Sequence, residues 1–337
     1  MKLPTPRWWY VREGAPAPVT RALLRPVSWI WAAVTARRIA TTVPVDVGVA
    51  VICVGNLTAG GTGKTPVVAE LLRRLSASGV IAHGLSRGYG GSLAGPTQVD
   101  PQTHTAAEVG DEPLMLAADA TIWVARDRVA GAKAAVAAGA QVIVMDDGHQ
   151  NPGLKKALSL VVVDGETRNN EWPLGDGAVF PSGPLREPLA VGLARADAVI
   201  LMLPADLQTP DPDLLKVFAK TPLLIARLLP TASPPSGPQV GFAGIGKPWK
   251  VERALQAAGC DLIEFVSFPD HAVYDERRLA SLADLADRHD AGLVTTQKDW
   301  VRLPLGWRER VTAWPVQAVF EDEAAIERLL HAVVSSQ

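Results

Sequence analysis

Short apolar segments alternate along the chain with segments in which apolar residues recur at helical spacing. The apolar segments are rich in β-branched residues, which is typical of buried strands. Strands that alternate with helices predict an α/β fold, with a mainly parallel sheet covered by helices on both faces. The expected strands are residues 47–54, 80–85, 120–125, 141–145, 159–163 and 198–202, and the expected helices include residues 66–75 and 129–138.

A segment rich in proline and serine, residues 230–238, divides this pattern into two parts. Such clusters are typical of linkers because they form neither helices nor strands. We therefore expect one domain over residues 39–229 and a second, smaller α/β domain over residues 239–337. In the second domain the expected strands are residues 239–243 and 291–296, and the expected helices are residues 249–258 and 279–287.

The segment Gly60-Gly61-Thr62-Gly63-Lys64-Thr65 lies between the first expected strand and the helix that follows it. Glycines let backbone N–H groups turn toward phosphate oxygens, and the positive end of the helix adds to the attraction. In such a loop, the lysine reaches the β- and γ-phosphates and the next hydroxyl residue binds Mg²⁺. The strict pattern has glycine where this chain has Thr58, so an ordinary glycine-rich turn is the alternative. We interpret residues 58–65, Ala59 included, as the phosphate-binding loop of a P-loop nucleotide enzyme.

Two acids, Asp146 and Asp147, follow directly after the apolar part of an expected strand. Ligands of open α/β sheets bind at the carboxyl ends of the strands, where such a carboxylate can face the phosphate loop. We expect Asp146 to hold Mg²⁺ directly or through water, with Asp147 beside it. Alone, two acids at this place would more often be part of a turn, and Asp164 ends another strand in the same way. The phosphate loop upstream favours the metal site.

Four further residues are candidates for chemistry. His271 can act as a general base because its pKa range includes working pH, and Asp111 can accept a proton or orient that base. Asp111 can equally cap the helix that follows it, and spacing alone does not pair it with His271. Arg186 can bind phosphate oxygens and Glu187 can assist the metal, or the two can form a surface ion pair.

Composition limits the class of protein. An apolar share of 48% and a charged share of 20% are typical of a globular chain with a large core. The net charge of −2 argues against a general nucleic-acid binder, and we predict no obligate protein partner. The two cysteines, Cys53 and Cys260, form no metal motif or disulfide framework, which indicates a reducing compartment.

The first 38 residues are basic and rich in tryptophan. Seven lysines and arginines stand against one acid, Glu13, and four of the ten tryptophans lie here. The apolar run at residues 26–36 is too short to span a bilayer, which takes about 20 residues, and it is no convincing signal peptide. Basic flanks with tryptophans predict that residues 1–38 contain a helix lying in the membrane interface. A helix packed on the core of the protein is the alternative.

Taken together, these segments resemble the tetraacyldisaccharide 4′-kinases, the lipid A kinases of Gram-negative bacteria. The family has a hydroxyl residue at the position of Thr58, which accounts for the irregular loop. The family often has His where this chain has Asn151, and Glu where it has Gln297, so roles of those two side chains are in doubt. The matching stretches are residues 55–66, 85–90, 110–113, 146–150, 185–188, 268–271 and 295–299.

The resemblance implies ATP-dependent phosphorylation of the 4′-hydroxyl of a tetraacylated glucosamine disaccharide 1-phosphate, giving lipid IVA. It implies two α/β/α domains around an active cleft, at the cytoplasmic face of the inner membrane. Asp111 and His271 would form a dyad that activates the sugar hydroxyl, while Lys64 stabilises the transferred phosphoryl group. The implied nucleotide site includes Asp147, Gln150 and Arg186, and the implied Mg²⁺ ligands are Thr65, Asp146, Asp147 and Glu187.

Two other functions are compatible with a phosphate-binding loop. One is a soluble kinase for a small metabolite, whose activity would not depend on lipid. The other is a nucleotide-switch ATPase or GTPase that acts through a protein partner. The pattern Asn-Lys-x-Asp that reads guanine is absent from the sequence, which disfavours a GTPase.

Overall fold

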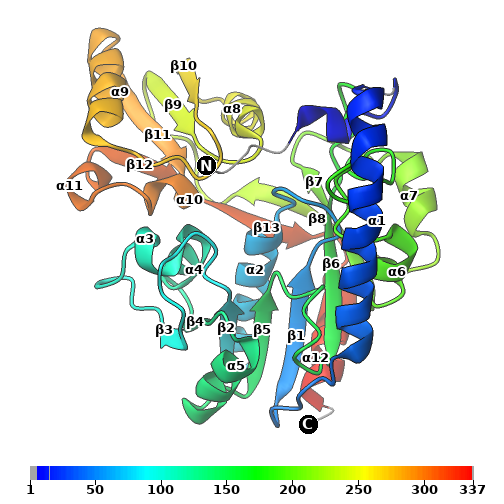
Figure 1. The fold of residues 1–337 in the computed structure, drawn as a ribbon. Coiled ribbons are helices and arrows are strands. Elements are labelled where there is room, and N and C mark those ends of the chain that lie inside the picture. The colour runs from blue at the N-terminus through cyan, green and yellow to red at the C-terminus, as the bar shows by residue number, and fades with distance from the viewer. Residues whose placement is uncertain (1–5, 15, 336–337) are drawn as a thin grey trace.

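The structure is a computed structural model that describes residues 6–14 and 16–335. Within these residues the chain forms a nine-stranded sheet and a four-stranded sheet, both flanked by helices (Figure 1). The predicted α/β fold with a second, smaller sheet is confirmed. Residues 1–5 and 15, which belong to the expected N-terminal segment, lie outside the described residues.

The larger sheet is parallel except at its two edges. Its strand order is β13–β8–β7–β6–β1–β5–β2–β4–β3, with β13 antiparallel to β8 and β3 antiparallel to β4. The six strands expected before the linker are all present, with their ends shifted by a few residues. In chain order the strands are β1 (Ala50–Gly55), β2 (Ala82–Ser86), β3 (Thr97–Gln98), β4 (Ile122–Val124), β5 (Val142–Asp146), β6 (Leu158–Asp164), β7 (Ala198–Pro204), β8 (Leu223–Pro230) and β13 (Val316–Phe320).

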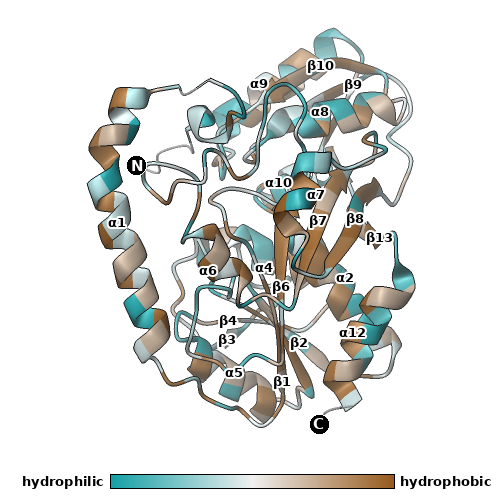
Figure 2. Cartoon of the chain, turned by 90° about the vertical axis from the view of Figure 1, so that its right-hand side faces the viewer, coloured by the Kyte–Doolittle hydropathy of each residue, from teal (hydrophilic) through white to brown (hydrophobic). Residues whose placement is uncertain are grey.

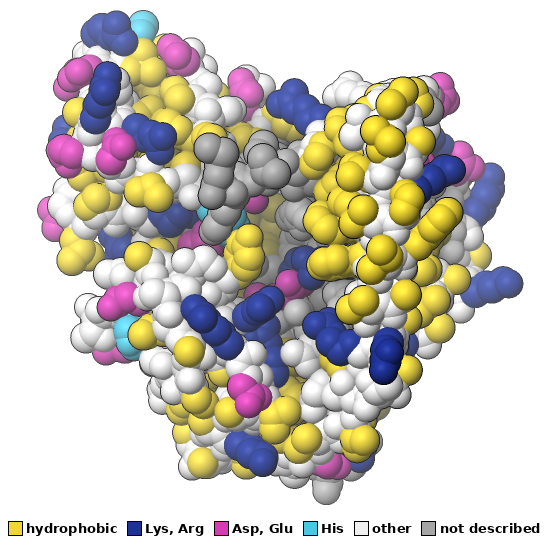
Figure 3. All heavy atoms as spheres, in the orientation of Figure 1, with side chains coloured by type: hydrophobic (Ala, Val, Ile, Leu, Met, Phe, Trp, Pro, Cys, Tyr) yellow, Lys and Arg dark blue, Asp and Glu magenta, His cyan; other side chains and the backbone are white. Residues whose placement is uncertain are grey.

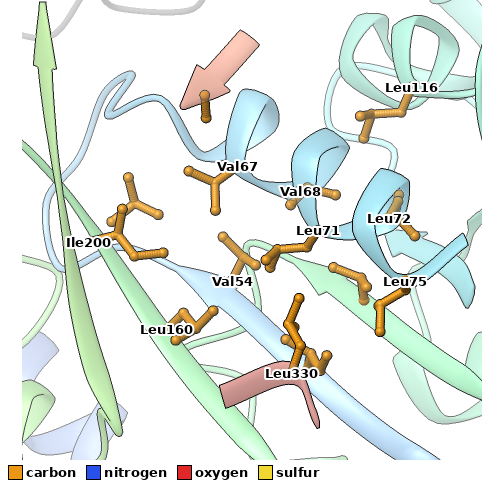
Figure 4. Close-up of a cluster of buried hydrophobic side chains, with 14 of the residues drawn as sticks. Val54, Val67, Val68, Leu71, Leu72, Leu75, Leu116, Leu160, Ile200 and Leu330 are labelled. Carbon is orange, nitrogen blue, oxygen red and sulfur yellow. The ribbon is translucent and has the colours of Figure 1, made fainter. Parts of the chain in front are cut away.

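The central strand β1 shows why helices cover both faces of this sheet. Ile52 and Val54 pack with α2 (Lys64–Ala77) and α12 (Glu323–Ser335), whereas Val51 and Cys53 pack with α5 (Arg128–Ala137). Successive side chains of a strand point to opposite faces, so a single apolar run builds two cores. Figure 4 shows the first core, and Figure 2 shows the hydrophobic strands between the layers of helices. The remaining helices of this unit after α2 are α3 (Ala106–Val109), α4 (Asp111–Leu116), α6 (Leu189–Leu193) and α7 (Pro212–Phe218).

The smaller sheet is parallel throughout, with the strand order β10–β9–β11–β12. Phe242, Leu279 and Leu282 are buried in its own hydrophobic core, which makes it a separate packing unit. Its strands are β9 (Gln239–Ala243), β10 (Leu262–Ser267), β11 (Gly292–Thr296) and β12 (Val311–Trp314), and its helices are α8 (Pro248–Ala257), α9 (Glu276–Arg288), α10 (Gln297–Trp300) and α11 (Leu305–Arg308).

After the smaller sheet the chain returns to the larger one. We expected residues 239–337 to form a single unit, but β13 pairs with β8 from Val316 opposite Pro230 to Phe320 opposite Ala226. The following helix, α12, buries Leu330 in the same core as α2. Apolar periodicity indicates that an element is present but not which sheet it joins, which is why the sequence pattern did not separate these residues. We propose that the smaller unit ends near residue 315.

The N-terminal part consists of a short 3₁₀ turn, η1 (Arg7–Tyr10), and the long helix α1 (Pro18–Thr41). Helix α1 runs along the outside of the larger unit (Figure 1). One side of α1 packs on the protein, since Arg21, Ser28 and Thr35 are buried there. The Ser28 hydroxyl lies 3.0 Å from the hydroxyl of Ser182. The packing of this side agrees with the alternative in which the N-terminal helix packs on the core of the protein.

The opposite side of α1 exposes large apolar side chains. Trp29, for example, is 70% exposed, and Figure 3 shows a row of hydrophobic side chains along the helix. In the part of the chain that the structure describes, no helix is both long enough and apolar enough to span a membrane. The other exposed apolar residues of α1 are Val19, Leu23, Val27, Ile30, Trp31 and Val34.

Candidate active site

The phosphate-binding loop connects the end of β1 at Gly55 to the start of α2 at Lys64. Gly60 and Gly63 have φ angles of +90° and +86°, which residues with a side chain rarely adopt. Gly63 is the N-cap of α2, and a Cβ atom at this position would lie only 3.0 Å from the Met202 side chain. The loop thus brings its own N–H groups and the N-terminus of α2 to one place, as anion binding requires.

Neighbouring segments hold this loop from outside. Arg186 Nε donates a hydrogen bond to the Thr58 carbonyl at 3.3 Å, and the Tyr10 hydroxyl donates one to the Ala59 carbonyl. Thr58 is buried, and its backbone pairs with that of Leu185. Thr58 therefore replaces the usual glycine at a point where the loop is fixed to the rest of the larger unit. No sequence signal pointed to the contact of Tyr10.

Asp147 joins the charged residues that the sequence placed in the nucleotide site. Arg186 Nη1 lies 2.9 and 3.0 Å from its two carboxylate oxygens, and Lys64 Nζ lies 3.5 Å from Oδ1. Burial alone would raise the pKa of Asp147, but Lys64 and Arg186 outweigh burial and hold this pKa well below its usual range. The structure therefore brings Lys64, Asp147 and Arg186 into one cluster.

Asp146, the last residue of β5, fits a role in binding a cation. It is 2% exposed, and its Oδ1 atom has no hydrogen-bond partner among the described residues. Burial, reinforced by the charge of Glu112, raises the pKa of Asp146 above its usual range. A buried polar atom without a partner is costly, so a ligand is expected to meet it. The Thr62 hydroxyl is likewise buried and unpartnered within the described part of the chain.

Residues near Asp146 can hold a metal only together with other oxygen ligands. Across residues 6–14 and 16–335, no group of three or more His, Cys, Asp or Glu side chains is arranged to hold a metal ion. Mg²⁺ is usually bound by one or two carboxylates together with phosphate and water oxygens. Asp146 and the hydroxyl of Thr65, one residue beyond Lys64, are donors of this kind. The residues present therefore fit a Mg²⁺ ion that arrives with a nucleotide.

Glu187 and Gln150 have partners other than those we expected. Both carboxylate oxygens of Glu187 lie 2.7 Å from Arg195 Nη2, and the residue is 2% exposed. Gln150 Nε2 donates to Glu187 Oε1 at 3.0 Å and to the Asn56 carbonyl at 2.9 Å. A buried carboxylate that meets an arginine in this way already has its charge compensated within the protein. The sequence did not predict these contacts, and the roles of Glu187 as a metal ligand and of Gln150 as a nucleotide contact stay predictions.

Asp111 and His271 are 160 positions apart in the chain, yet Oδ2 and Nδ1 of this pair lie 2.8 Å apart. Asp111 begins α4, and its Oδ1 accepts the Glu112 N–H at 3.0 Å. Burial alone would raise the pKa of Asp111, but His271, Lys298 and Arg302 outweigh burial and lower it. An ionised carboxylate can only accept a hydrogen bond, so His271 donates its Nδ1–H to Asp111.

The turn before α8 brings this dyad close to the phosphate loop. The backbone N–H of His271 donates to the Gly244 carbonyl at 3.1 Å. A Cβ atom on Gly246, two residues further, would lie 3.7 Å from both the Gly61 nitrogen and the Asp270 carboxylate. Figure 3 shows a hollow between the smaller unit and the side of α1. The base and the anion-binding loop therefore lie beside each other, although they belong to different sheets.

The sequence did not reveal two further groups of charged residues. Arg128 Nη2 donates to the Asp146 carbonyl at 3.3 Å, and burial lowers the pKa of Arg128 to about 10. Asp164 ends β6 as Asp146 ends β5, but it pairs with Lys250 at 2.6 Å and Lys247 at 3.0 Å. Both aspartates end a strand, but Asp164 binds the smaller unit whereas Asp146 lies in the candidate metal site. Nothing in the local sequence distinguishes the two.

Comparison with known proteins agrees with this geometry. A protein from Phenylobacterium zucineum named tetraacyldisaccharide 4′-kinase is 68% identical over 330 residues, covering 98% of this chain and 99% of that protein. One of the same name from Maricaulis maris is 51% identical over 334 residues, covering 98% of this chain and 96% of that protein. The crystal structure of LpxK from Aquifex aeolicus in complex with ATP superposes with a TM-score of 0.72 at 25% identity, covering 94% of this chain and 99% of that one.

The family model for tetraacyldisaccharide-1-P 4′-kinase matches residues 20–335. This range includes both sheets, the phosphate loop and the dyad. The resemblance inferred from short motifs is thus confirmed over nearly the whole length, and the chain belongs to the tetraacyldisaccharide-1-P 4′-kinase family.

Proposed function

We propose that this chain transfers the γ-phosphoryl group of ATP to the 4′-hydroxyl of a tetraacylated glucosamine disaccharide 1-phosphate. The observation that carries the proposal is the contact between Asp111 and His271 beside the phosphate loop. Phosphoryl transfer to an alcohol benefits from a base that removes the hydroxyl proton next to the bound triphosphate. Family membership supports this choice of acceptor over a small metabolite.

His271 is the base in this mechanism. Its Nε2 atom takes the proton of the attacking hydroxyl, while Nδ1–H stays hydrogen-bonded to Asp111. The ionised carboxylate fixes the tautomer of the ring and stabilises the imidazolium that forms. A well-placed base of this kind contributes about 10²–10⁴-fold to the rate.

The phosphate side of the reaction depends on charge compensation. The transition state of phosphoryl transfer is loose and anionic, so fixed positive groups stabilise it. These positive groups are Lys64, the N–H groups of the loop and the N-terminus of α2. Arg186 adds a further positive charge nearby, where it pairs with Asp147. Asp146 and Thr65 would hold Mg²⁺, which neutralises phosphate charge when it is bound.

Helix α1 would place the enzyme at the cytoplasmic face of the inner membrane. Its outward side exposes Leu23, Trp29 and Ile30, which can enter the apolar boundary of a bilayer. Arg25 and Arg37 on the same helix are exposed and can attract anionic headgroups. The acyl chains of the acceptor could then stay in the membrane while its sugar headgroup reaches the dyad.

The test is transfer of labelled γ-phosphate from ATP to purified disaccharide 1-phosphate in detergent micelles. We expect a labelled lipid from the parent protein and none from Lys64→Met, which controls for contaminating kinases. Absence of labelled lipid from folded parent protein would overturn the proposal. Label on a water-soluble acceptor would indicate a metabolite kinase, and slow ATP hydrolysis alone would indicate a nucleotide switch.

A further inference from the structure

Arg302, which lies just after α10, contacts two groups that His271 also contacts. Arg302 Nε lies 3.0 Å from Asp111 Oδ2, the oxygen that also meets His271 Nδ1 at 2.8 Å. Arg302 Nη1 donates to the Gly244 carbonyl at 3.0 Å, and the His271 backbone N–H donates to the same carbonyl at 3.1 Å. The Arg302 Nε–H itself donates to the Lys298 carbonyl at 3.1 Å, so the contact of Arg302 with Asp111 is an ion pair. Arg302 and His271 therefore each contact both Asp111 and the Gly244 carbonyl, and these four residues form a closed ring around the dyad.

A second carboxylate fixes this ring from within the smaller unit. Asp299 is fully buried, and its Oδ1 atom lies 3.2 Å from Arg302 Nη1. The same oxygen accepts the Gly244 N–H at 2.9 Å and the Tyr274 hydroxyl at 2.5 Å. Burial of a guanidinium is costly unless carboxylates compensate its charge. The Arg302 side chain is 7% exposed, and Asp111 and Asp299 together provide that compensation.

His271 needs such a support because of its own backbone. Its φ angle is +57°, a left-handed conformation that persists in a residue with a side chain only where its surroundings impose it. The ring imposes it at two points, since Gly244 holds the His271 backbone and Asp111 holds the imidazole. Arg302 meets both Asp111 and the Gly244 carbonyl through one planar guanidinium.

We propose that Arg302 is a positioning residue of the dyad. It holds the Asp111 carboxylate and the Gly244 carbonyl at the spacing that keeps His271 Nδ1 on Asp111, so that Nε2 faces the acceptor. This proposal rests on the proposed function, because it assigns a role within the same site.

The first test compares Arg302→Gln with Arg308→Gln. Loss of the ring should lower kcat about 10–100-fold, since small misplacements of a catalytic group cost rates of this order. The KM for ATP should stay within about twofold, because the nucleotide groups belong to the larger unit. Arg308 is a matched control from the same segment, since it donates to the Val301 and Leu303 carbonyls, and its loss should change kcat by less than about twofold.

A double-mutant cycle separates positioning from a general structural role. In the His271→Ala background, Arg302→Gln should lower kcat by no more than about twofold further, because residues that act as a unit are non-additive. If instead the double variant loses kcat by the product of the two single-variant factors, the proposal is overturned. Arg302→Lys keeps the positive charge without the planar fork, so its kcat should still fall at least about fivefold. Full activity of the lysine variant would show that charge alone is sufficient.

A readout without substrate keeps this test independent of the reaction. The Nδ1–H proton of His271, identified in the proton NMR spectrum by its absence in His271→Ala, should broaden or shift in Arg302→Gln. It should remain in place in Arg308→Gln. An unchanged resonance in Arg302→Gln would reject the positioning role even if phosphoryl transfer is confirmed. A parent protein that phosphorylates no lipid would instead reject the proposed function.

Discussion

Replacing Asp164 with Asn should weaken the attachment of the smaller unit to the larger sheet. Asp164 is buried at the end of β6, and its two oxygens meet Lys250 at 2.6 Å and Lys247 at 3.0 Å. Lys250 lies on α8 and Lys247 immediately before it, so these ion pairs join the two units. Asparagine keeps the size of the side chain but removes the charge that both lysines share.

The pKa of Asp164 sets the size of the effect. Burial alone would raise this pKa, but Lys250 and Lys247 lower it from the ordinary 3.8 to about 2. One pKa unit corresponds to about 1.4 kcal/mol, so the charged form stabilises the folded protein by roughly 2 kcal/mol. Because the folded-state pKa is the lower one, this stability is complete above the unfolded-state pKa near 4. It is lost as the pH falls toward 2.

Urea unfolding at pH 7 and pH 3, followed by tryptophan fluorescence, measures this contribution. Trp249 reports locally, since Lys247 and Lys250 lie 5.9 and 5.8 Å from its ring. We expect Asp164→Asn to lower the free energy of unfolding by about 2 kcal/mol at pH 7, and by about half as much at pH 3. The control is Asp213→Asn, whose exposed pairs with Lys216 and Arg12 should together contribute less than about 1 kcal/mol.

Two outcomes would refute this reasoning. One is an equal loss of stability in Asp164→Asn and Asp213→Asn, which would mean that burial of the Asp164 pair adds nothing. The other is a difference between parent and Asp164→Asn that stays constant or grows on acidification, since a lowered pKa requires it to shrink.

Three further changes probe the site and the helix that supports it. His271→Ala should lower kcat about 10²–10⁴-fold with little change in the KM for ATP, and equal rates in variant and parent would reject the base. Trp31→Phe removes the 3.0 Å hydrogen bond from Nε1 to the Arg186 carbonyl. Such a bond contributes about 1 kcal/mol, so its loss should raise the KM for ATP about fivefold. Trp29→Phe is its matched control, because Trp29 is 70% exposed, and an equal effect of both would contradict the link to Arg186. Asp146→Asn should raise the Mg²⁺ concentration needed for half-maximal activity at least about tenfold, and an unchanged requirement would remove Asp146 from the metal site.

Local pattern predicted the parts of the site that are contiguous in sequence. The phosphate loop follows from a strand, a glycine-rich segment and a helix in immediate succession, and Asp147 follows from the strand before it. The contact of Asp111 with His271 did not follow, because it joins two sheets across 160 positions. Residue type and neighbourhood predicted Glu187 as a metal ligand, which stays a prediction, but they did not indicate that Arg195 would meet both of its oxygens. Residues that can take part in catalysis or binding can be found from the sequence, but the side chains that they contact depend on tertiary packing.

The return of the chain to the larger sheet has a consequence for synthesis. Residues 316–335 follow the smaller unit in the chain, so β13 and α12 are synthesised after it. Until then β8 is an unpaired edge, and the apolar side of α2 lacks part of its cover. Such edges promote association between chains. A nonsense mutation after Pro315 should therefore damage the nucleotide-binding unit rather than the smaller one, as loss of soluble protein on expression would reveal.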